Sequence, residues 1–355
     1  MSSIPTPQQG PPPTPENIFN GLNAFQRTAA LKTAIELDLF TAIAAEAESG
    51  GSAGATAAAV ARRVGAAERG VRILCDFLMV GGYLTKDGAG GGSAYRLAPD
   101  VAAFLDRRSP AYMGGAVEFL ASPHLTGAFE ELTAAVRKGG TAQAEGGSVA
   151  PENPMWVRFA NAMAPLMRFP AGQLADVVDV PADRPVRVLD IAAGHGLFGL
   201  AFAQKHSDVR VVAQDWPAVL EVARGNARAA GVADDRYELL PGSAFDVDFG
   251  TGYDLVLLTN FLHHFDPPTN EALLRKVHAA LADGGRAVTL EFVPDESRTS
   301  PPGAVAFGLI MLATTPAGDA YTFGELEGMF ARAGFSRSEL HALPMGINQA
   351  VVSHK

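Results

Sequence analysis

The spacing of hydrophobic residues predicts a first half of the chain that is mainly helical. Over residues 16–105, apolar positions recur mostly at helical intervals, as in NAFQRTAALKTAIELDLFTAIAA. Two further helices are expected in TAAAVARRVG and AERGVRILCDFLMVGGYL, with a tight turn between them. The segment TKDGAGGGSAYRLAP then indicates two short strands joined by a Gly-rich turn. Helix, turn, helix and hairpin in this order are typical of a winged-helix domain.

From residue 186 onward, short apolar strands alternate with amphipathic helices. The strand-like segments are VRVLDIAA, VRVVAQD, RYELLPG, YDLVLLTN, RAVTLEFV and INQAVVSHK. The helical segments include LFGLAFAQKH, PAVLEVARGNARAAG, EALLRKVHAALADGG and FGELEGMFARAGF. This alternation predicts an α/β fold with a doubly wound, mostly parallel, Rossmann-like sheet. Ligands of such sheets bind outside the carboxyl ends of the strands.

Four regions are therefore expected along the chain. Residues 1–15 form a Pro-rich, disordered tail that lacks the basic and apolar parts of a signal peptide. A winged-helix domain covers 16–110, and a mainly helical linker and cap with a loop at 138–154 covers 111–180. The sheet domain covers 181–355.

Length and composition agree with this division and restrict the function. The 355 residues exceed one average domain, and 48% hydrophobic with 19% charged residues is ordinary for a globular protein. No apolar run reaches the ~18 residues of a transmembrane helix. The net charge of −10 argues against general binding to nucleic acids or anionic membranes. The single cysteine, Cys75, excludes an internal disulfide framework, fits a cytoplasmic location and is expected to be buried and inert.

A glycine-containing loop follows the first strand of the expected sheet. In VLDIAAGHGLFG, Gly194 and Gly196 allow a sharp turn and close approach to a ligand. With Gly199 the motif also reads as the dinucleotide fingerprint G-x-G-x-x-G, but Asp190 within the strand and the mid-chain position argue against that interpretation. Asp215 lies 21 residues after Gly194 and suits ribose hydroxyls of a dinucleotide or of S-adenosylmethionine, unless it only caps the next helix.

Taken together, these motifs resemble the S-adenosylmethionine-dependent class I methyltransferases. VLDIAAGHG, VVAQDW, LLPGSAF, DLVLLTNFLHHF and LADGGRAVTLEFV follow one another in the order of that family. More narrowly, residues 16–355 resemble bacterial relatives of the plant small-molecule O-methyltransferases, including the hydroxyneurosporene methyltransferase type. The resemblance implies that S-adenosylmethionine is the methyl donor and leaves as S-adenosylhomocysteine, and that the winged-helix domain forms a homodimer.

The resemblance also implies a cofactor site. Asp190 and the loop from Gly194 to Gly196 would lie by the amino-acid end of the cofactor, Asp215 would hold its ribose, and Trp216 would lie beside the adenine. The segment GSAF matches the family motif G-D-x-F, with a serine in place of the charged aspartate at the adenine edge. The remaining residues expected at the cofactor are Ser243, Ala244, Phe245 and Asn260.

The doublet His263–His264 directly follows the strand YDLVLLTN. In the resembled family the histidine that matches His263 is the general base, a role that suits imidazole because it titrates near neutral pH. Glu291, 28 residues later at the end of the next strand, is expected to orient it, as a glutamate does in the family. The family's second glutamate aligns with Ala320, and the adjacent Asp319 is the candidate to replace it.

A metal site at the doublet is not expected, and no metal is predicted for the enzyme. Adjacent residues on one strand point to opposite sides, and no Cys, His, Asp or Glu cluster at ligand spacing flanks the doublet. His264 is therefore expected to point away from His263, toward the helix layer or the domain interface.

Apolar stripes on two segments are candidates for the acceptor pocket, although such stripes are equally typical of core. The stripe in VRFANAMAPLM has the i, i+4, i+8 spacing of one helix face, and the resemblance places this helix over the substrate. The residues expected at the acceptor are Phe159, Met163, Met167, Phe307, Met311, Thr315 and Asn348. A pocket of this composition favours a flat or hydrophobic small molecule.

Several alternatives stay open at this point. The same scaffold can methylate nitrogen, carbon or sulfur, or bind the cofactor without transferring its methyl group. A winged helix also occurs in transcription regulators, but ERGVRILCDFLM is apolar on several faces and the chain is acidic, which favours dimerisation. An NAD(P) dehydrogenase is disfavoured because no residue set for hydride transfer accompanies the glycine loop.

Overall fold

The computed structural model describes residues 13–49, 54–88, 93–181, 183–344 and 348–355. The chain divides into two compact units, Met1–Val117 and Glu118–Lys355. Most of the predicted tail, residues 1–12, and the turn of the predicted hairpin, residues 89–92, lie outside the described residues.

The first unit combines helices with a small antiparallel sheet. Its helices are α1 (Glu16–Leu22), α2 (Ala24–Glu36), α3 (Leu39–Ser49), α4 (Ala57–Val64), α5 (Glu68–Val80) and α6 (Pro99–Phe104). Its strands pair in the order β1 (Ala55–Thr56), β3 (Ala94–Leu97) and β2 (Leu84–Asp87). The two helices and the hairpin predicted from the sequence are present as α4, α5, β2 and β3. The helical periodicity before them is broken between α2 and α3, where Asp38 has a φ of 55°.

The core of the first unit forms where α3 and α5 pack against the hairpin. Phe40 and Ile43 of α3 and Leu78 of α5 are fully buried beside Tyr95 of β3. Cys75 lies in this core, and burial raises the pKa of its thiol to about 12. The expected burial of Cys75 is confirmed. Its low reactivity stays a prediction, which the raised pKa supports because a protonated thiol is a poor nucleophile.

The second unit is built on a seven-stranded sheet in the order β6-β5-β4-β7-β8-β10-β9. The strands are β4 (Val186–Ile191), β5 (Val209–Asp215), β6 (Tyr237–Pro241), β7 (Tyr253–Thr259), β8 (Leu281–Glu291), β9 (Arg337–Ala342) and β10 (Gln349–His354). Strands β4 to β8 are parallel, and β10 runs antiparallel to both β8 and β9. The predicted doubly wound, mostly parallel sheet is confirmed.

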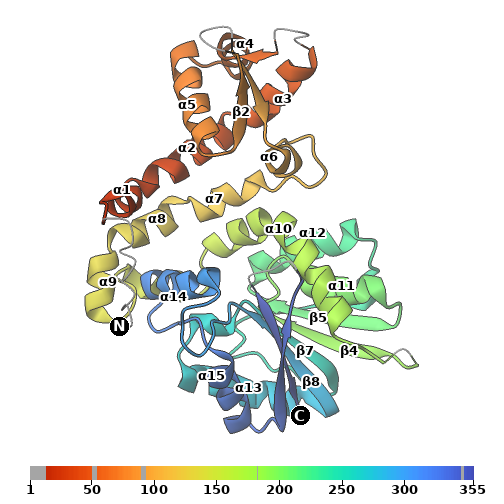
Figure 1. Ribbon diagram of the computed structural model, residues 1–355. Coiled ribbons are helices and arrows are strands. Elements are labelled where there is room, and N and C mark those ends of the chain that lie inside the picture. Colours follow the sequence, from red (N-terminus) through yellow and green to blue (C-terminus); the bar gives the residue numbers. More distant parts are fainter. Residues whose placement is uncertain (1–12, 50–53, 89–92, 182, 345–347) are drawn as a thin grey trace, which may run out of the picture. The chain divides into compact units, whose positions relative to one another are not determined.

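Helices cover both faces of this sheet. The helices from Val117 onward are α7 (Val117–Leu120), α8 (Pro123–Glu130), α9 (Leu132–Lys138), α10 (Met155–Val177), α11 (Leu197–Lys205), α12 (Pro217–Ala229), α13 (Pro267–Ala280), α14 (Pro302–Thr314) and α15 (Phe323–Arg332). Figure 1 shows α10, α11 and α12 on one side of the strands and α13 and α15 on the other. No helix in the described part of the chain is long and apolar enough to cross a membrane.

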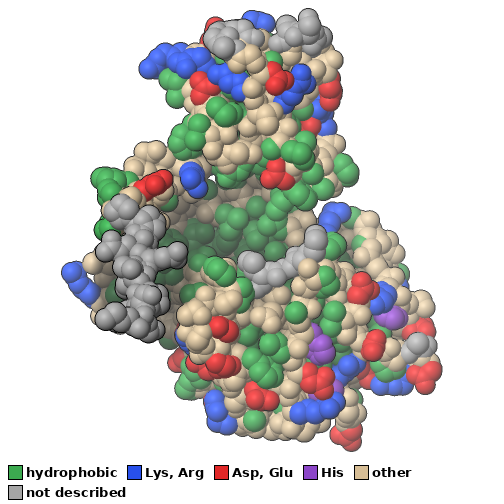
Figure 2. Space-filling model, viewed as in Figure 1, with side chains coloured by type: hydrophobic (Ala, Val, Ile, Leu, Met, Phe, Trp, Pro, Cys, Tyr) green, Lys and Arg blue, Asp and Glu red, His purple; other side chains and the backbone are tan. Residues whose placement is uncertain are grey.

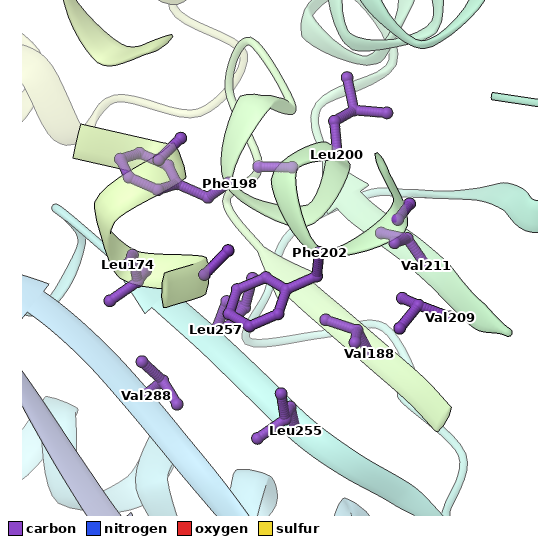
Figure 3. Packing of buried hydrophobic residues seen from close by; sticks show 14 of the residues in the cluster. Leu174, Val188, Phe198, Leu200, Phe202, Val209, Val211, Leu255, Leu257 and Val288 are labelled. Carbon is purple, nitrogen blue, oxygen red and sulfur yellow. The ribbon is translucent and has the colours of Figure 1, made fainter. Parts of the chain in front are cut away.

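The strands bury side chains on both faces, as expected for a parallel sheet between helices. Phe202 of α11 packs over Val188 of β4 and Leu257 of β7, and Phe198 of the same helix belongs to the same core (Figure 3). The neighbouring Leu189 of β4 belongs to the opposite core, with α13 and α15. Burying an aliphatic or aromatic side chain stabilises the fold by roughly 1.5–3 kcal/mol. These layers fix the strand ends from which the functional site projects.

The structure differs from the sequence-based expectation at one element boundary and in one additional strand. The helix expected over residues 271–285 ends at Ala280, and β8 begins at Leu281. Strand β9 was not predicted, because RSELHA lies at the sheet edge and all of its residues are partly or fully exposed. An edge strand of this kind has no hydrophobic alternation for a sequence pattern to detect.

Candidate active site

A cavity of about 690 Å³ lies in the second unit, at the carboxyl ends of the parallel strands. Its wall is formed by the segments that follow β4, β5, β6, β7 and β8, together with side chains of α10 and α14. This is the edge at which ligands of doubly wound sheets bind, and the volume is typical of small-molecule sites. Figure 2 shows a hollow in this unit whose visible wall is largely hydrophobic.

The charged groups of the cavity wall are acidic or imidazole groups. No lysine or arginine is among the described residues that line the cavity. The titratable lining residues are Asp215, Asp246, His124, His195, His263 and His264. A ligand with a cationic centre suits two carboxylates, whereas a pyrophosphate would find no basic side chain here.

The glycine loop between β4 and α11 turns sharply at the cavity wall. Gly194 and Gly196 have φ values of 57° and 76°, in the left-handed region that favours glycine. A Cβ on Gly196 would overlap the Tyr237 hydroxyl and lie 3.0 Å from the Cβ of Ala223, so this glycine lets α12 and β6 pack against the loop. Gly194 lines the cavity, whereas Gly196 does not.

Two buried carboxylates hold this loop in place. Asp190 accepts the N–H of Gly199 at 3.0 Å, and Asp215 accepts the N–H groups of Gly194 at 2.8 Å and Trp216 at 2.6 Å. Burial raises the pKa of Asp190 to about 7, with a smaller effect of Asp215, and burial raises the pKa of Asp215 to about 6. Asp215 lines the cavity, but Asp190 lies beneath the loop and supports it from below.

The other residues expected at the cofactor surround the same part of the cavity. Trp216, Ser243, Ala244, Phe245 and Asn260 all line it. The Ser243 hydroxyl accepts the N–H of Phe245 at 3.2 Å, so the serine that replaces the family's aspartate also shapes its own turn.

His263 and Glu291 meet as predicted, at the ends of adjacent strands. His263 Nδ1 lies 2.5 Å from Glu291 Oε2, and both side chains are almost fully buried. A carboxylate at this distance accepts the Nδ1 proton, which leaves Nε2 of a neutral ring as the free lone pair. His263 lines the cavity. The imidazole therefore has the tautomer of a general base that faces a ligand.

Glu291 also organises the backbone that carries His263. Its Oε1 accepts the N–H groups of Phe261 and Leu262, each at 3.0 Å, and that of His263 at 3.4 Å. Asn270 of α13 donates to the carbonyls of Leu262 and Phe265, at 2.9 and 3.1 Å. The turn after β7 is thus held by Glu291 through its N–H groups and by Asn270 through its carbonyl groups.

The orientation expected for His264 is wrong. His263 and His264 lie in a 3-10 turn, Leu262–His264, and not on a strand. Successive side chains of such a turn diverge by about 120° rather than pointing to opposite sides. The two rings lie 4.2 Å apart between centroids with 37° between their planes, and both line the same cavity.

The structure does not place Asp319 in the role of the family's second glutamate. Its carboxylate accepts the N–H of Ala320 at 2.8 Å and lies 3.6 Å from Arg298, away from the cavity wall. Ala320 is buried and has no polar side chain. His263 therefore has a single carboxylate partner, Glu291.

The residues expected at the acceptor divide into two groups. Those that line the cavity are Phe159, Met163, Met167, Phe307 and Met311. Thr315 and Asn348 do not line it: the Thr315 hydroxyl donates to the carbonyl of Met311 at 2.7 Å, and Asn348 donates to Asn260 at 3.1 Å. Asn348 is therefore placed to hold a cavity residue, and its direct contact with an acceptor stays a prediction.

Sequence reasoning missed several cavity residues, and three of them have ring side chains: Trp156, Phe292 and His195. Trp156 lies one turn before Phe159 on α10, and its indole N–H donates to the carbonyl of Ser148 at 3.1 Å. Phe292 follows Glu291 and stacks on Phe307 with 3.8 Å between ring centroids. His195 lies between the two loop glycines, and burial lowers its pKa to about 4. The helical stripe could have revealed Trp156, whereas the other two depend on how the loops turn.

No group of three or more His, Cys, Asp or Glu residues in the described ranges could hold a metal ion. The expectation that no metal takes part in the chemistry stays a prediction.

Comparison with protein families gives two matches that together cover most of the chain. The family model described as the O-methyltransferase domain matches residues 129–336. The model described as the O-methyltransferase dimerisation domain matches residues 19–107.

Individual proteins resemble the chain over nearly its whole length. A solved structure from Nostoc punctiforme, described as a candidate O-methyltransferase, is 51% identical, covers 97% of this chain and 100% of its own, and has a TM-score of 0.90. The tetracenomycin polyketide synthesis 8-O-methyl transferase TcmO of Streptomyces glaucescens is 28% identical over 91% of both chains. The 3-hydroxy-5-methyl-1-naphthoate 3-O-methyltransferase of Streptomyces sahachiroi is 29% identical over 87% of this chain and 86% of that protein.

Proposed function

This chain belongs to the O-methyltransferase family, and from that premise we propose that it transfers a methyl group from S-adenosylmethionine to a hydroxyl group of a small aromatic or hydrophobic metabolite. The observation that carries the proposal is the His263–Glu291 pair, which presents an unprotonated Nε2 at the wall of a mainly apolar cavity. A histidine base is needed for oxygen acceptors in particular, because a hydroxyl is a poor nucleophile until it loses its proton. Methylation of nitrogen, carbon or sulfur is the alternative, and analysis of the product would distinguish it from methylation of oxygen.

The residues of the cavity fit S-adenosylmethionine. Gly194 leaves the approach to the loop open, since a Cβ there would have only the carbonyl of Ala192 within 4 Å, at 3.9 Å. We propose that Asp215 accepts hydrogen bonds from the ribose hydroxyls and that Trp216, Ser243, Ala244, Phe245 and Asn260 hold the adenine and the rest of the cofactor. Asp190 and Gly196 would act indirectly by shaping the loop. The absence of basic groups from the described lining agrees with a cationic cofactor.

In the proposed mechanism the bound cofactor supplies a methyl group activated by its positive sulfonium centre. His263 Nε2 accepts the proton of the acceptor hydroxyl, whose oxygen would take the methyl group to give a methyl ether; the sulfur–methyl bond would break with its electron pair going to sulfur, so that S-adenosylhomocysteine leaves. Glu291 stabilises the resulting imidazolium, because its Oε2 keeps the hydrogen bond to Nδ1. The apolar side chains from α10 and α14 orient the acceptor and exclude water.

The nature of the acceptor is proposed from the cavity wall and from the relatives. Phe159 and Phe307 present aromatic rings, and the sulfur atoms of Met163, Met167 and Met311 make favourable contacts with such rings. The two named Streptomyces relatives act on a polyketide and on a naphthoate. An aromatic acceptor of secondary metabolism is the class that this wall suits.

The proposal is tested with S-adenosylmethionine that carries a labelled methyl group and a panel of hydroxylated aromatic compounds. We expect label in an ether product and release of S-adenosylhomocysteine. Calorimetry is expected to show binding of S-adenosylhomocysteine, weakened roughly 10-fold or more in Asp215→Ala because a charge-assisted hydrogen-bond acceptor is lost. His263→Ala is expected to keep that binding and lose turnover. Undiminished activity of His263→Ala would remove the histidine from the proposed role.

We further propose that the enzyme is a cytoplasmic homodimer that needs no metal and binds no nucleic acid or membrane. The match of residues 19–107 to a dimerisation domain supports the homodimer. The unpaired, buried Cys75 suits the reducing conditions of the cytoplasm. In the same proposal, residues 16–110 dimerise, 111–180 link the units and cover the substrate, and 181–355 bind the cofactor. A gel-shift assay tests the exclusion of nucleic acid, activity in the presence of a metal chelator tests that of a metal, and sedimentation with lipid vesicles tests that of a membrane.

A further inference from the structure

The ring of His264 is a polar group at the cavity wall that the proposed mechanism does not use. It lies 4.2 Å from the ring of His263, centroid to centroid, and 5.3 Å from that of Trp156, which meets it edge-on. All three residues line the cavity. The 3-10 turn that carries both histidines is held by Glu291 and Asn270, so the two rings keep a fixed relation to each other.

The hydrogen bonds of the pair determine which nitrogen atoms carry protons. His264 Nδ1 lies 3.1 Å from the carbonyl oxygen of Phe261, and His263 Nδ1 lies 2.5 Å from Glu291. A carbonyl and a carboxylate can only accept, so Nδ1 is the protonated atom in both neutral rings. The hydrogen bonds of the two rings within the described ranges of the chain are made through Nδ1. The doublet therefore leaves two Nε2 lone pairs for a ligand, on rings whose centroids lie 4.2 Å apart.

His264 is not suited to be a second base. Burial, and next the neighbouring His263, hold the pKa of His264 well below its usual range. Around it lie the rings of Trp156, Phe261 and Phe265, none of which accepts a proton. A neutral ring with a protonated Nδ1 can accept a hydrogen bond through Nε2 but cannot keep a proton there. Its contribution to an acceptor molecule is orientation.

We propose that His264 determines acceptor specificity: its Nε2 accepts a hydrogen bond from a second hydroxyl group next to the one that His263 deprotonates. The preferred acceptors are then aromatic compounds with two adjacent hydroxyl groups. This inference rests on the proposed function, because it assigns the second group of the same acceptor. An acceptor with one hydroxyl would leave Nε2 of His264 unpaired in an apolar site, and such a site discriminates against it roughly 10-fold or more.

The purely structural alternative is that His264 only supports the ring of His263 by stacking. The two roles predict different behaviour for His264→Phe. Phenylalanine keeps a flat ring beside His263 and Trp156 but has no acceptor atom. A stacking role predicts no change in selectivity, whereas a hydrogen-bonding role predicts that selectivity is lost.

The test measures binding without turnover, in the complex with S-adenosylhomocysteine. The probes are 2,3-dihydroxynaphthalene and 2-naphthol, which differ by one hydroxyl, and tryptophan fluorescence or calorimetry gives both dissociation constants. We expect the wild-type enzyme to bind the dihydroxy probe about 10-fold or more tighter than 2-naphthol. His264→Phe is expected to bind the two equally, and His264→Asn, which retains an acceptor oxygen, to recover part of the preference.

Equal binding of the two probes by the wild-type enzyme, no detectable binding of the dihydroxy probe, or a preference that survives in His264→Phe would overturn the proposal. Unchanged affinity of His264→Phe for S-adenosylhomocysteine shows that the site is intact. Because no methyl transfer is measured, these outcomes are separate from a failure of the proposed function, which the labelled-methyl assay detects.

Discussion

Asp190 is buried under the glycine loop and Asp215 beside it, and burial makes both carboxyl groups weaker acids than usual. Their pKa values are raised to about 7 and about 6 by burial, although each accepts backbone N–H bonds that favour the charged form. A carboxyl whose pKa is raised in the folded state holds its proton while the unfolded chain, with a pKa of about 4, has lost it. The contribution of such a carboxyl to the free energy of unfolding is therefore highest below pH ~4, where both states are protonated. It declines as the pH rises from ~4 to the folded pKa and is level above it.

Asp190→Asn is expected to remove this dependence, because asparagine keeps an oxygen that can accept the N–H of Gly199 and does not ionise. As the pH rises from 4 through 7, the free energy of unfolding of the cofactor-free variant should rise relative to wild type by on the order of 4 kcal/mol, and it should stay level above the folded pKa of about 7. Urea unfolding at a series of pH values measures the difference. The exposed Asp235→Asn serves as the control, and a difference that does not vary with pH would contradict the prediction.

Glu291 joins two tasks in one side chain, since it holds the turn with one oxygen and His263 with the other. In Glu291→Gln the amide oxygen can still accept the backbone N–H groups, but the amide NH₂ would donate to Nδ1 and move the imidazole proton to Nε2. We expect turnover to fall by about 10²–10⁴-fold with unchanged binding of S-adenosylhomocysteine. Steady-state kinetics and calorimetry provide the measurements, with the exposed Glu327→Gln as control. Equal loss of binding and turnover would indicate collapse of the turn instead.

At this scale the sequence predicts residues whose position depends on the strand that carries them. Asp215, His263 and Glu291 all lie at or just beyond the carboxyl end of a parallel strand, and such ends meet at one edge. The place of His264 could not be predicted in this way, because it depends on a 3-10 turn that no hydrophobic pattern encodes. The contact that Asn348 makes was likewise not predictable from the strand pattern: the residue was expected at the acceptor, and its side chain donates to Asn260, which lines the cavity.

At the scale of elements, the turn after β7 depends on a loop from a distant part of the chain. The segment after α14 packs directly on the backbone of the histidine doublet at Gly318, where a Cβ would overlap the carbonyl oxygen of His263 and lie 2.7 Å from Thr315 Oγ1. The Tyr321 hydroxyl then donates to the carbonyl of Phe265 at 2.5 Å. Contact between these two segments therefore requires a residue without a side chain.

Gly318→Ala is expected to displace the turn, because the atoms it would meet are mainly backbone and cannot move independently. We predict a loss of stability on the order of 1–3 kcal/mol and a loss of activity larger than that of stability. Thermal unfolding and turnover are measured together. Gly225→Ala, inside α12 with no atom within 4 Å of the new Cβ, is the matched control and should stabilise by about 0.5–1 kcal/mol. Normal turnover in Gly318→Ala would contradict the proposed dependence.

At the scale of the whole molecule, the first unit carries apolar side chains that its own core does not bury. Ile18, Phe19 and Leu22 of α1 and Phe25 of α2 are 66%, 59%, 68% and 67% exposed. Exposed aromatic and aliphatic side chains clustered on neighbouring helices are typical of protein interfaces. This surface agrees with the match of the region to a dimerisation domain.

We expect the double substitution Phe19→Glu and Phe25→Glu to give a monomer, because two charges per chain would have to be buried in the interface. Size-exclusion chromatography with light scattering measures the mass, which for wild type should be twice that of one chain. Asn20→Glu, an exposed polar position on the same helix, controls for the added charge. A wild-type monomer would rule out the homodimer.

The parallel register of β7 and β8 limits where residues can be inserted or deleted during the evolution of the enzyme. Residues 259 and 290 are paired across these strands; Glu291 directly follows residue 290, and His263 lies four residues after residue 259, in the 3-10 turn. A shift of one residue in this pairing would turn Glu291 to the other face, so the carboxyl edge tolerates no insertion between the strand and the turn. The turn at the opposite edge carries no part of the site: Gly250, before β7, has a φ of 69° that favours glycine, but a Cβ there would meet no atom within 4 Å, so the space around this turn is open. Variation in length during evolution should therefore accumulate at the amino edge, while the carboxyl edge changes only by substitution.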